Sequence, residues 1–200
     1  EGTAIDYLIS SCVVEENIDA LDLVLGDKNA LMVSIRITGY GKNYKIKPTC
    51  ENCAKMSEIN FDLSELGIKR LKLDPVEAGK NEFNFELPVT KKNVIFKFLT
   101  SHDDRERDRK QKFWKDKFKV ENYVTSYLEA SIISIDGITD KNKISHFIKN
   151  MPAFDSKSLR SFIKENEPGI DMSHQFACHH CQHVNKANLA ITPEFFWPRT

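Results

Sequence analysis

The sequence predicts an α+β fold with a split metal-binding ribbon, a small antiparallel sheet and an inserted helical subdomain. The first observation is a pair of distant Cys-x-x-Cys motifs, Cys50 with Cys53 and Cys178 with Cys181. The second is a change of period between them. Short segments alternate apolar and polar residues, as half-buried strands do, and later segments place apolar residues three and four positions apart, as helices do.

The four paired cysteines are candidate ligands of a structural zinc ion. Each two-residue gap lets the chain turn so that both sulfurs face one point, and two such turns supply four thiolates for tetrahedral Zn²⁺. Since four cysteines leave no open coordination position, the predicted zinc is structural. Ribbon sites commonly separate their pairs by about 15–20 residues, whereas residues 54–177 intervene here. The zinc ribbon is therefore predicted to be split, with the replacement of a cysteine by His179, His180 or His183 left open.

Composition limits the class of protein. The chain of 200 residues is 40% hydrophobic and 29% charged, which suits one soluble domain or one domain with a large insertion. Its formal net charge is zero, which disfavours a dedicated nucleic-acid binder. Cys12 is left over from the two pairs, and an odd thiol favours a reducing compartment over a disulfide framework. No apolar run reaches membrane-spanning length, and the first residues have no basic signal region.

The first half of the chain divides into two predicted segments. Residues 1–25, acidic and apolar by turns, are expected to form an N-terminal arm that packs on the body or on a partner. Residues 26–100 are expected to hold an apolar helix, the first zinc turn and a small sheet attached to that turn. Strands of the first half are expected at residues 44–47, 59–63, 83–87 and 94–99, with 88–93 joining the last two as a hairpin.

The apolar helix of the second segment has a predicted cap and a predicted end. Asp27 can cap its start, and the glycines Gly39 and Gly41 stop it. The charged Arg36 on this helix is either a functional arginine or, as we favour, a side chain that reaches solvent or pairs with a carboxylate.

Residues 101–170 are expected to form the helical insert. Residues 103–119 hold eight basic and five acidic residues with Phe113, Trp114 and Phe118 among them. Basic residues beside aromatic ones can bind nucleic acid, but the mixture favours a solvated helix with opposite charges three and four positions apart. Three amphipathic helices should follow. The first spans residues 120–135, the second is capped by Thr139 and ends before Pro152, and the third is capped by Ser156 and ends at Pro168.

Residues 171–200 are expected to hold the second zinc turn and an aromatic tail. A return strand is predicted at residues 188–191, followed by the cluster Phe195-Phe196-Trp197-Pro198. These rings either lock the ribbon to the sheet, which we favour, or anchor a partner protein.

Several segments together resemble a known family. They run in order through most of the chain from residue 26 onward, and they are Gly26–Asn29, Ile35–Gly41, Cys50–Cys53, Phe85–Pro88, Ser134–Gly137, Phe176–Cys181 and Phe195–Pro198. With these pieces the chain resembles the small baseplate-hub proteins of T-even-like contractile-tailed bacteriophages. The resemblance implies a late phage protein without enzyme activity that contacts other tail hub or baseplate proteins. It implies action in the host cytoplasm during assembly and leaves open whether the protein stays in the virion tail baseplate.

Two rival functions are weaker. An enzyme would need a catalytic motif, and the sequence has no His-Glu-x-x-His, P-loop or Gly-x-Ser-x-Gly. A nucleic-acid-binding zinc ribbon remains the alternative, supported by residues 105–119 and opposed by the neutral net charge. The leading prediction is a non-enzymatic hub component or hub-assembly factor held together by zinc.

Overall fold

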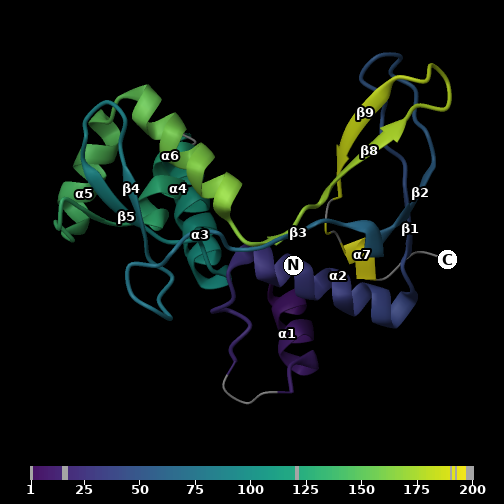
Figure 1. Ribbon diagram of the computed structural model, residues 1–200, viewed down its shortest axis with the longest axis horizontal. Coiled ribbons are helices and arrows are strands. Elements are labelled where there is room, and N and C mark those ends of the chain that lie inside the picture. The colour runs from purple at the N-terminus through teal and green to yellow at the C-terminus, as the bar shows by residue number, and fades with distance from the viewer. Residues whose placement is uncertain (1, 15–17, 120–121, 190, 192, 197–200) are drawn as a thin grey trace.

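The computed structural model describes residues 2–14, 18–119, 122–189, 191 and 193–196 (Figure 1). The helices are α1 (Gly2–Cys12), α2 (Leu25–Tyr40), α3 (Ser101–Phe118), α4 (Tyr123–Ser131), α5 (Lys141–Asn150), α6 (Ala153–Asn166) and α7 (Pro193–Phe196). The strands are β1 (Asn43–Ile46), β2 (Ile59–Asp62), β3 (Ile68–Lys69), β4 (Phe83–Glu86), β5 (Asn93–Phe96), β6 (Ile132–Ile135), β7 (Gly169–Ile170), β8 (Ser173–Ala177) and β9 (Val184–Asn188), and a 3-10 turn, η1 (Leu63–Glu65), follows β2.

Two separate hydrophobic cores divide these elements into two lobes, which Figure 1 shows side by side. The helical lobe packs α4, α5 and α6 against the antiparallel sheet β4-β5-β6. The cysteine lobe holds α1, α2 and α7 with the hairpins β1-β2 and β8-β9. The structure is therefore a mixture of helices and small antiparallel sheets, as the sequence predicts. The four-segment division of the chain remains a prediction.

The sheet of the helical lobe departs from the sequence prediction in two ways. Strands β4 and β5 are not attached to the first cysteine pair, because Phe83 and Phe96 lie in the other core. The helix predicted at residues 120–135 ends at Ser131, and β6 then pairs antiparallel with β5. Three of the four β6 residues are β-branched isoleucines, which fit a buried strand better than a helix. Val120, at the start of that predicted helix, lies outside the described residues.

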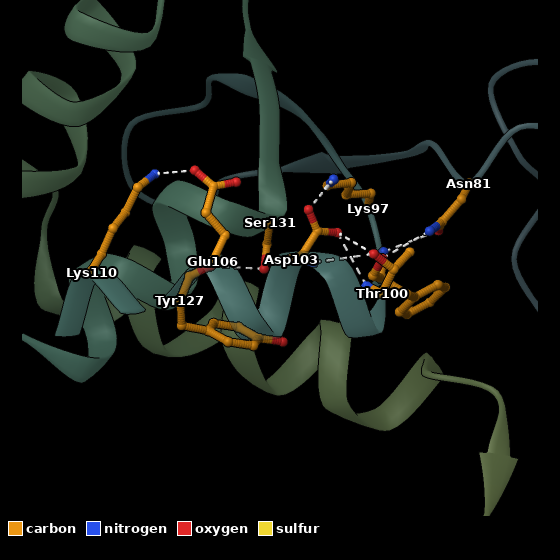
Figure 2. A network of polar contacts seen from close by, with 9 residues as sticks. Asn81, Lys97, Thr100, Asp103, Glu106, Lys110, Tyr127 and Ser131 are labelled. Atoms are coloured by element: carbon orange, nitrogen blue, oxygen red, sulfur yellow. Dashed lines mark hydrogen bonds and ion pairs between the residues drawn. The ribbon is translucent and has the colours of Figure 1, made fainter. Parts of the chain in front are cut away.

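Helix α3 begins with a capping box. The Thr100 hydroxyl accepts the Asp103 N–H at 3.3 Å, and the Asp103 carboxylate accepts the Thr100 N–H at 3.1 Å. Figure 2 shows Lys97 reaching the other oxygen of Asp103, at 2.8 Å. In the same view the Asn81 side chain bonds the backbone of Phe98 on the segment that leads into the helix. These contacts fix the start of α3 at the edge of the sheet.

Other helix caps differ from prediction by one to four residues. Helix α2 begins at Leu25, so Asp27 lies in its first turn instead of capping it. Helix α5 is capped by Asp140 and not Thr139, and α6 begins at Ala153, ahead of Ser156. The predicted 103–119 helix is confirmed as α3.

The lobes meet where α2 begins. Leu25 N–H donates to Leu99 O at 2.9 Å, and β3 pairs antiparallel with β7 beside this contact. Gly26 lies directly on Gly169, so closely that a Cβ on Gly26 would stand 1.8 Å from the carbonyl oxygen of Pro168. Gly169 has φ +139°, a conformation open to glycine. The junction therefore depends on two glycines that let two backbones touch.

The N-terminal helix α1 packs on the body of the protein. Ile9 is fully buried in the core of the cysteine lobe. Asp6 is buried as well and pairs with Lys28 on α2 and Arg105 on α3. The segment predicted as an arm thus contacts elements of both lobes in its described part.

Candidate metal centre

The first cysteine pair lies in the loop between β1 and β2. The loop closes by two 2.9 Å backbone bonds, from Cys50 N–H to Lys55 O and from Ala54 N–H to Cys50 O. Ala54 takes a positive φ of 56°, which turns the chain back toward β2. As a result Cys50 and Cys53 point their sulfurs to the same side of the loop.

The second pair lies in an equivalent loop between β8 and β9. Cys178 N–H donates to His183 O and Gln182 N–H to Cys178 O, again at 2.9 Å each. Gln182 has a positive φ of 60°, matching the position of the first loop's left-handed residue. The return strand therefore begins at Val184, directly after this loop, and not at residue 188 as predicted.

The two loops face each other and bring the four predicted sulfurs together. All four lie within 4.8 Å of one another, and Cys50 to Cys181 and Cys53 to Cys178 are 3.7 Å apart. A disulfide needs about 2.05 Å, so these are four separate thiols. Cys50 and Cys178 are buried, with Cys53 and Cys181 half-buried at the rim.

The donor set fits a tetrahedral metal ion. A tetrahedron with metal–sulfur bonds of about 2.3 Å has sulfur–sulfur edges of about 3.8 Å, close to the two 3.7 Å separations here. Soft thiolate ligands select soft or borderline metals such as Zn²⁺. The four-cysteine cluster could therefore hold a metal ion.

The thiols of the cluster differ in acidity. A backbone hydrogen bond from His180, with Ser57 and Cys181 N–H adding to it against burial, lowers the pKa of Cys178 to about 5. A backbone hydrogen bond from Cys53, with others from Asn52 and Asn185, lowers the pKa of Cys50 below its usual value, also against burial. The thiolate of Cys178 is thus favoured even in the metal-free cluster, and the Cys50 thiol is more acidic than an ordinary cysteine.

Cys53 behaves in the opposite way. A backbone hydrogen bond from Lys55 favours its thiolate, but burial and the three neighbouring sulfurs outweigh that bond and raise the pKa of Cys53 to about 11. Negative charge cannot be spread over all four sulfurs without a cation. Metal binding to this cluster would therefore release protons.

The neighbouring histidines contribute backbone and not ring atoms. Among the described residues, the group of possible metal ligands consists of the four cysteine sulfurs and includes no histidine nitrogen. His179 N–H donates to the Ser57 hydroxyl and His180 N–H donates to Cys178 Sγ at 3.4 Å. The side chains of both histidines are exposed.

Ser57 and Asn185 were not predicted from the sequence, but they are buried and touch the cluster. Asn185 reaches Cys50 and Ser57 reaches Cys178. The signal was present, because each lies four residues after the second cysteine of its pair.

Arg36 does not reach solvent, and among the described residues no carboxylate pairs with it. Its side chain is 5% exposed, donates to Gly41 O at 3.2 Å and lies over the rings of Tyr40 and Tyr44. These contacts tie the end of α2 to the start of β1. Arg36 is thus a packed arginine that positions the strand leading to the first cysteine loop.

The other candidates lie apart from the cluster. Helix α3 shows the predicted pairing of opposite charges, such as Lys110 with Glu106 at 2.7 Å. Cys12 is exposed at the end of α1. Phe195 and Phe196 are buried in the core of the cysteine lobe, where they serve the predicted lock. Trp197 and Pro198 lie outside the described residues.

Fold and site together define an α+β protein with four clustered cysteines that could hold a metal ion. A family model described as T4 bacteriophage base plate protein matches residues 1–197, and the chain belongs to this family. No curated protein and no solved structure matches the chain. Within the part of the chain that the structure describes, no helix is both long and apolar enough to cross a lipid bilayer.

Proposed function

We propose that the chain is a non-enzymatic component or assembly factor of the phage baseplate hub. It acts through contacts with other hub and baseplate proteins, in the host cytoplasm while the tail is built. The family match over residues 1–197 carries this proposal, since it supports a structural role in the baseplate. The segments that resemble hub proteins narrow the role to the hub.

The four cysteines would hold a structural Zn²⁺ that clamps the two hairpins of the cysteine lobe. Cys50, Cys53, Cys178 and Cys181 are the ligands, and they leave no position for water or substrate. Structural zinc in zinc-finger peptides contributes about 10 kcal/mol to folding. The metal would therefore keep the cysteine lobe rigid enough to present a fixed docking surface.

Metal content and partners can be tested on the same protein. Native mass spectrometry is expected to find one zinc ion per chain, and Cys178→Ser to lose it while Cys12→Ser keeps it. Co-purification from infected cells is expected to recover other baseplate proteins. A metal-free wild-type chain would remove the zinc site, and a chain recovered without tail proteins would remove the hub role. Analysis of purified virions then decides whether the protein stays in the finished baseplate.

A nucleic-acid-binding zinc protein is the second candidate, because of the end of α3. Phe113 and Trp114 are 56% and 47% exposed there, among basic residues. Against it stand the zero net charge and the pairing of Arg107 with Asp104. Retention on heparin or DNA that falls steeply with salt would favour this function. We expect weak retention that Phe113→Ala leaves unchanged.

A further inference from the structure

Two buried polar side chains cross between the cysteine loops. Ser57, 3% exposed, belongs to the first hairpin but serves the second. Its hydroxyl lies 3.6 Å from Cys178 Sγ and accepts the His179 N–H at 3.3 Å. The hydroxyl accepts the His179 N–H through one lone pair, which leaves its single proton available to donate to the sulfur.

Asn185, 4% exposed, makes the converse contacts from the second hairpin to the first. Its amide nitrogen lies 3.5 Å from Cys50 Sγ, and its amide oxygen accepts the Glu51 N–H at 2.9 Å. The same nitrogen donates to His183 O at 2.9 Å, inside its own loop. Asn185 is thus held by one loop while it completes the other.

The contacts of the two residues correspond to each other between the two loops. Each residue touches the sulfur of the first cysteine of the opposite pair and accepts the N–H of the residue after it. The loops obey the same relation, since the bonds Cys50 N–H to Lys55 O and Cys178 N–H to His183 O occupy matching positions. Each loop therefore has its first cysteine and the following N–H contacted by a side chain of the other loop.

We propose that Ser57 and Asn185 are reciprocal positioning residues of the metal site. Each sets the orientation of the first cysteine in the opposite loop, so that the four sulfurs are aimed at one point before a metal arrives. This inference rests on the proposed metal site and adds to it the residues that govern affinity.

With a metal bound, these contacts would donate hydrogen bonds to the thiolate ligands. A metal-bound thiolate has no proton, so the Ser57 hydroxyl and the Asn185 amide must donate to it. Four thiolates around a divalent cation carry an excess of negative charge in a largely buried site, and a donor to each buried sulfur offsets part of it. Loss of partners that orient metal ligands typically costs about 10- to 100-fold in metal affinity.

The test uses the full-length chain with Co²⁺ as a spectroscopic probe and Zn²⁺ affinity from competition with a chelator. Ser57→Ala removes both contacts of Ser57. Asn185→Asp keeps the shape and the acceptor for Glu51 N–H but replaces the donor to Cys50. Matched controls come from the β8–β9 hairpin, because Ser173 bonds Asp171 away from the sulfurs and Asn188 is exposed on β9. The controls are Ser173→Ala and Asn188→Asp.

We expect Ser57→Ala and Asn185→Asp each to raise the Kd for Zn²⁺ by about 10- to 100-fold and to shift the sulfur-to-cobalt charge-transfer band. The affinity of the double variant for Zn²⁺ should fall by less than the product of the two single factors. The reason is that both residues position the same two facing loops. Ser57→Thr, which keeps the hydroxyl, should restore affinity.

Affinities and spectra equal to those of the controls would overturn the inference and leave the metal site standing. So would a loss of thermal stability with unchanged Kd and spectrum, because that result indicates packing alone. A wild-type chain that binds neither ion would overturn both the site and the inference.

Discussion

Asp155 shows how one residue fixes a loop far from it in sequence. It is fully buried on α6, where its carboxylate accepts the backbone N–H groups of Val89 and Thr90 and the Thr90 hydroxyl. Burial alone would raise the pKa of Asp155, but these donors outweigh it and lower the pKa below its usual value. The β4–β5 connection is thus held in place by a charged acceptor and not by apolar packing.

Removing this acceptor should destabilise the helical lobe. Asp155→Ala leaves two part-buried backbone N–H groups without their partner, and a donor left unpaired in a buried site costs about 1–3 kcal/mol. We expect the free energy of unfolding in urea to fall by about that amount. Glu165→Ala, at an exposed position of the same helix, is the control and should change it little.

The same carboxylate predicts an acid dependence. Because the folded pKa of Asp155 lies below the unfolded value of about 3.9, its contribution is fully present above that value and is lost as pH falls through the folded pKa. The stability difference between wild type and Asp155→Asn should therefore shrink below about pH 4, measured by urea unfolding at stepped pH. A constant difference down to pH 2 would show that the charge is not what stabilises the loop.

Among the elements, the start of α2 lies in close backbone contact with the start of β7. Gly26 touches Gly169 and Pro168 O, so any side chain at residue 26 must push β7 away from α2. Gly39 lies on the same helix with no atom within 4 Å of a Cβ placed there. The two glycines therefore have opposite structural roles.

Their alanine variants should move stability in opposite directions. Gly26→Ala is expected to destabilise by about 1–3 kcal/mol, as other overpacked sites do. Gly39→Ala should stabilise by up to about 1 kcal/mol, because alanine has the higher helix propensity. Urea unfolding measures both changes in the free energy of unfolding. Equal effects at the two sites would contradict the close approach of Gly26 to β7.

Residue spacing within short segments predicted some elements correctly, but it could not predict elements that depend on contacts between distant segments. The amphipathic helices α5 and α6 and the opposite charges of α3 follow from spacing within a few residues. The four cysteines were predictable because metal-binding motifs are short. Strand β6 was not, since Ile132 and Ile135 satisfy a helical spacing, and only pairing with β5 makes them a strand. Ser57 and Asn185 share a position four residues after a second cysteine, but no local pattern shows that their partners lie on the opposite hairpin.

At the scale of the whole molecule, each lobe has its own core. The contacts where the lobes meet include the backbone bonds from Leu25 to Leu99 and from Ser101 to Leu23, the short β3–β7 pair and the ion pair of buried Asp6 with Arg105. The sulfur cluster lies entirely in the cysteine lobe. Loss of a metal there should therefore not unfold the helical lobe.

Hydrogen exchange after chelation tests this separation. We expect faster amide exchange in residues 43–62 and 173–189, while residues 83–98 and 123–166 keep their protection. Cys12→Ser should respond as wild type does, because Cys12 lies outside the cluster. Loss of protection throughout both lobes would show that the two cores unfold as one.

The long stretch between the two cysteine pairs also orders events in time on the ribosome. Cys53 is made 125 residues before Cys178, and at about 5–20 residues per second that interval lasts roughly 6–25 s. During it the residues of the helical lobe emerge and can fold, while the first pair supplies only two of the four sulfurs of the cluster. The four-sulfur cluster can form only on a chain whose other lobe has already been translated.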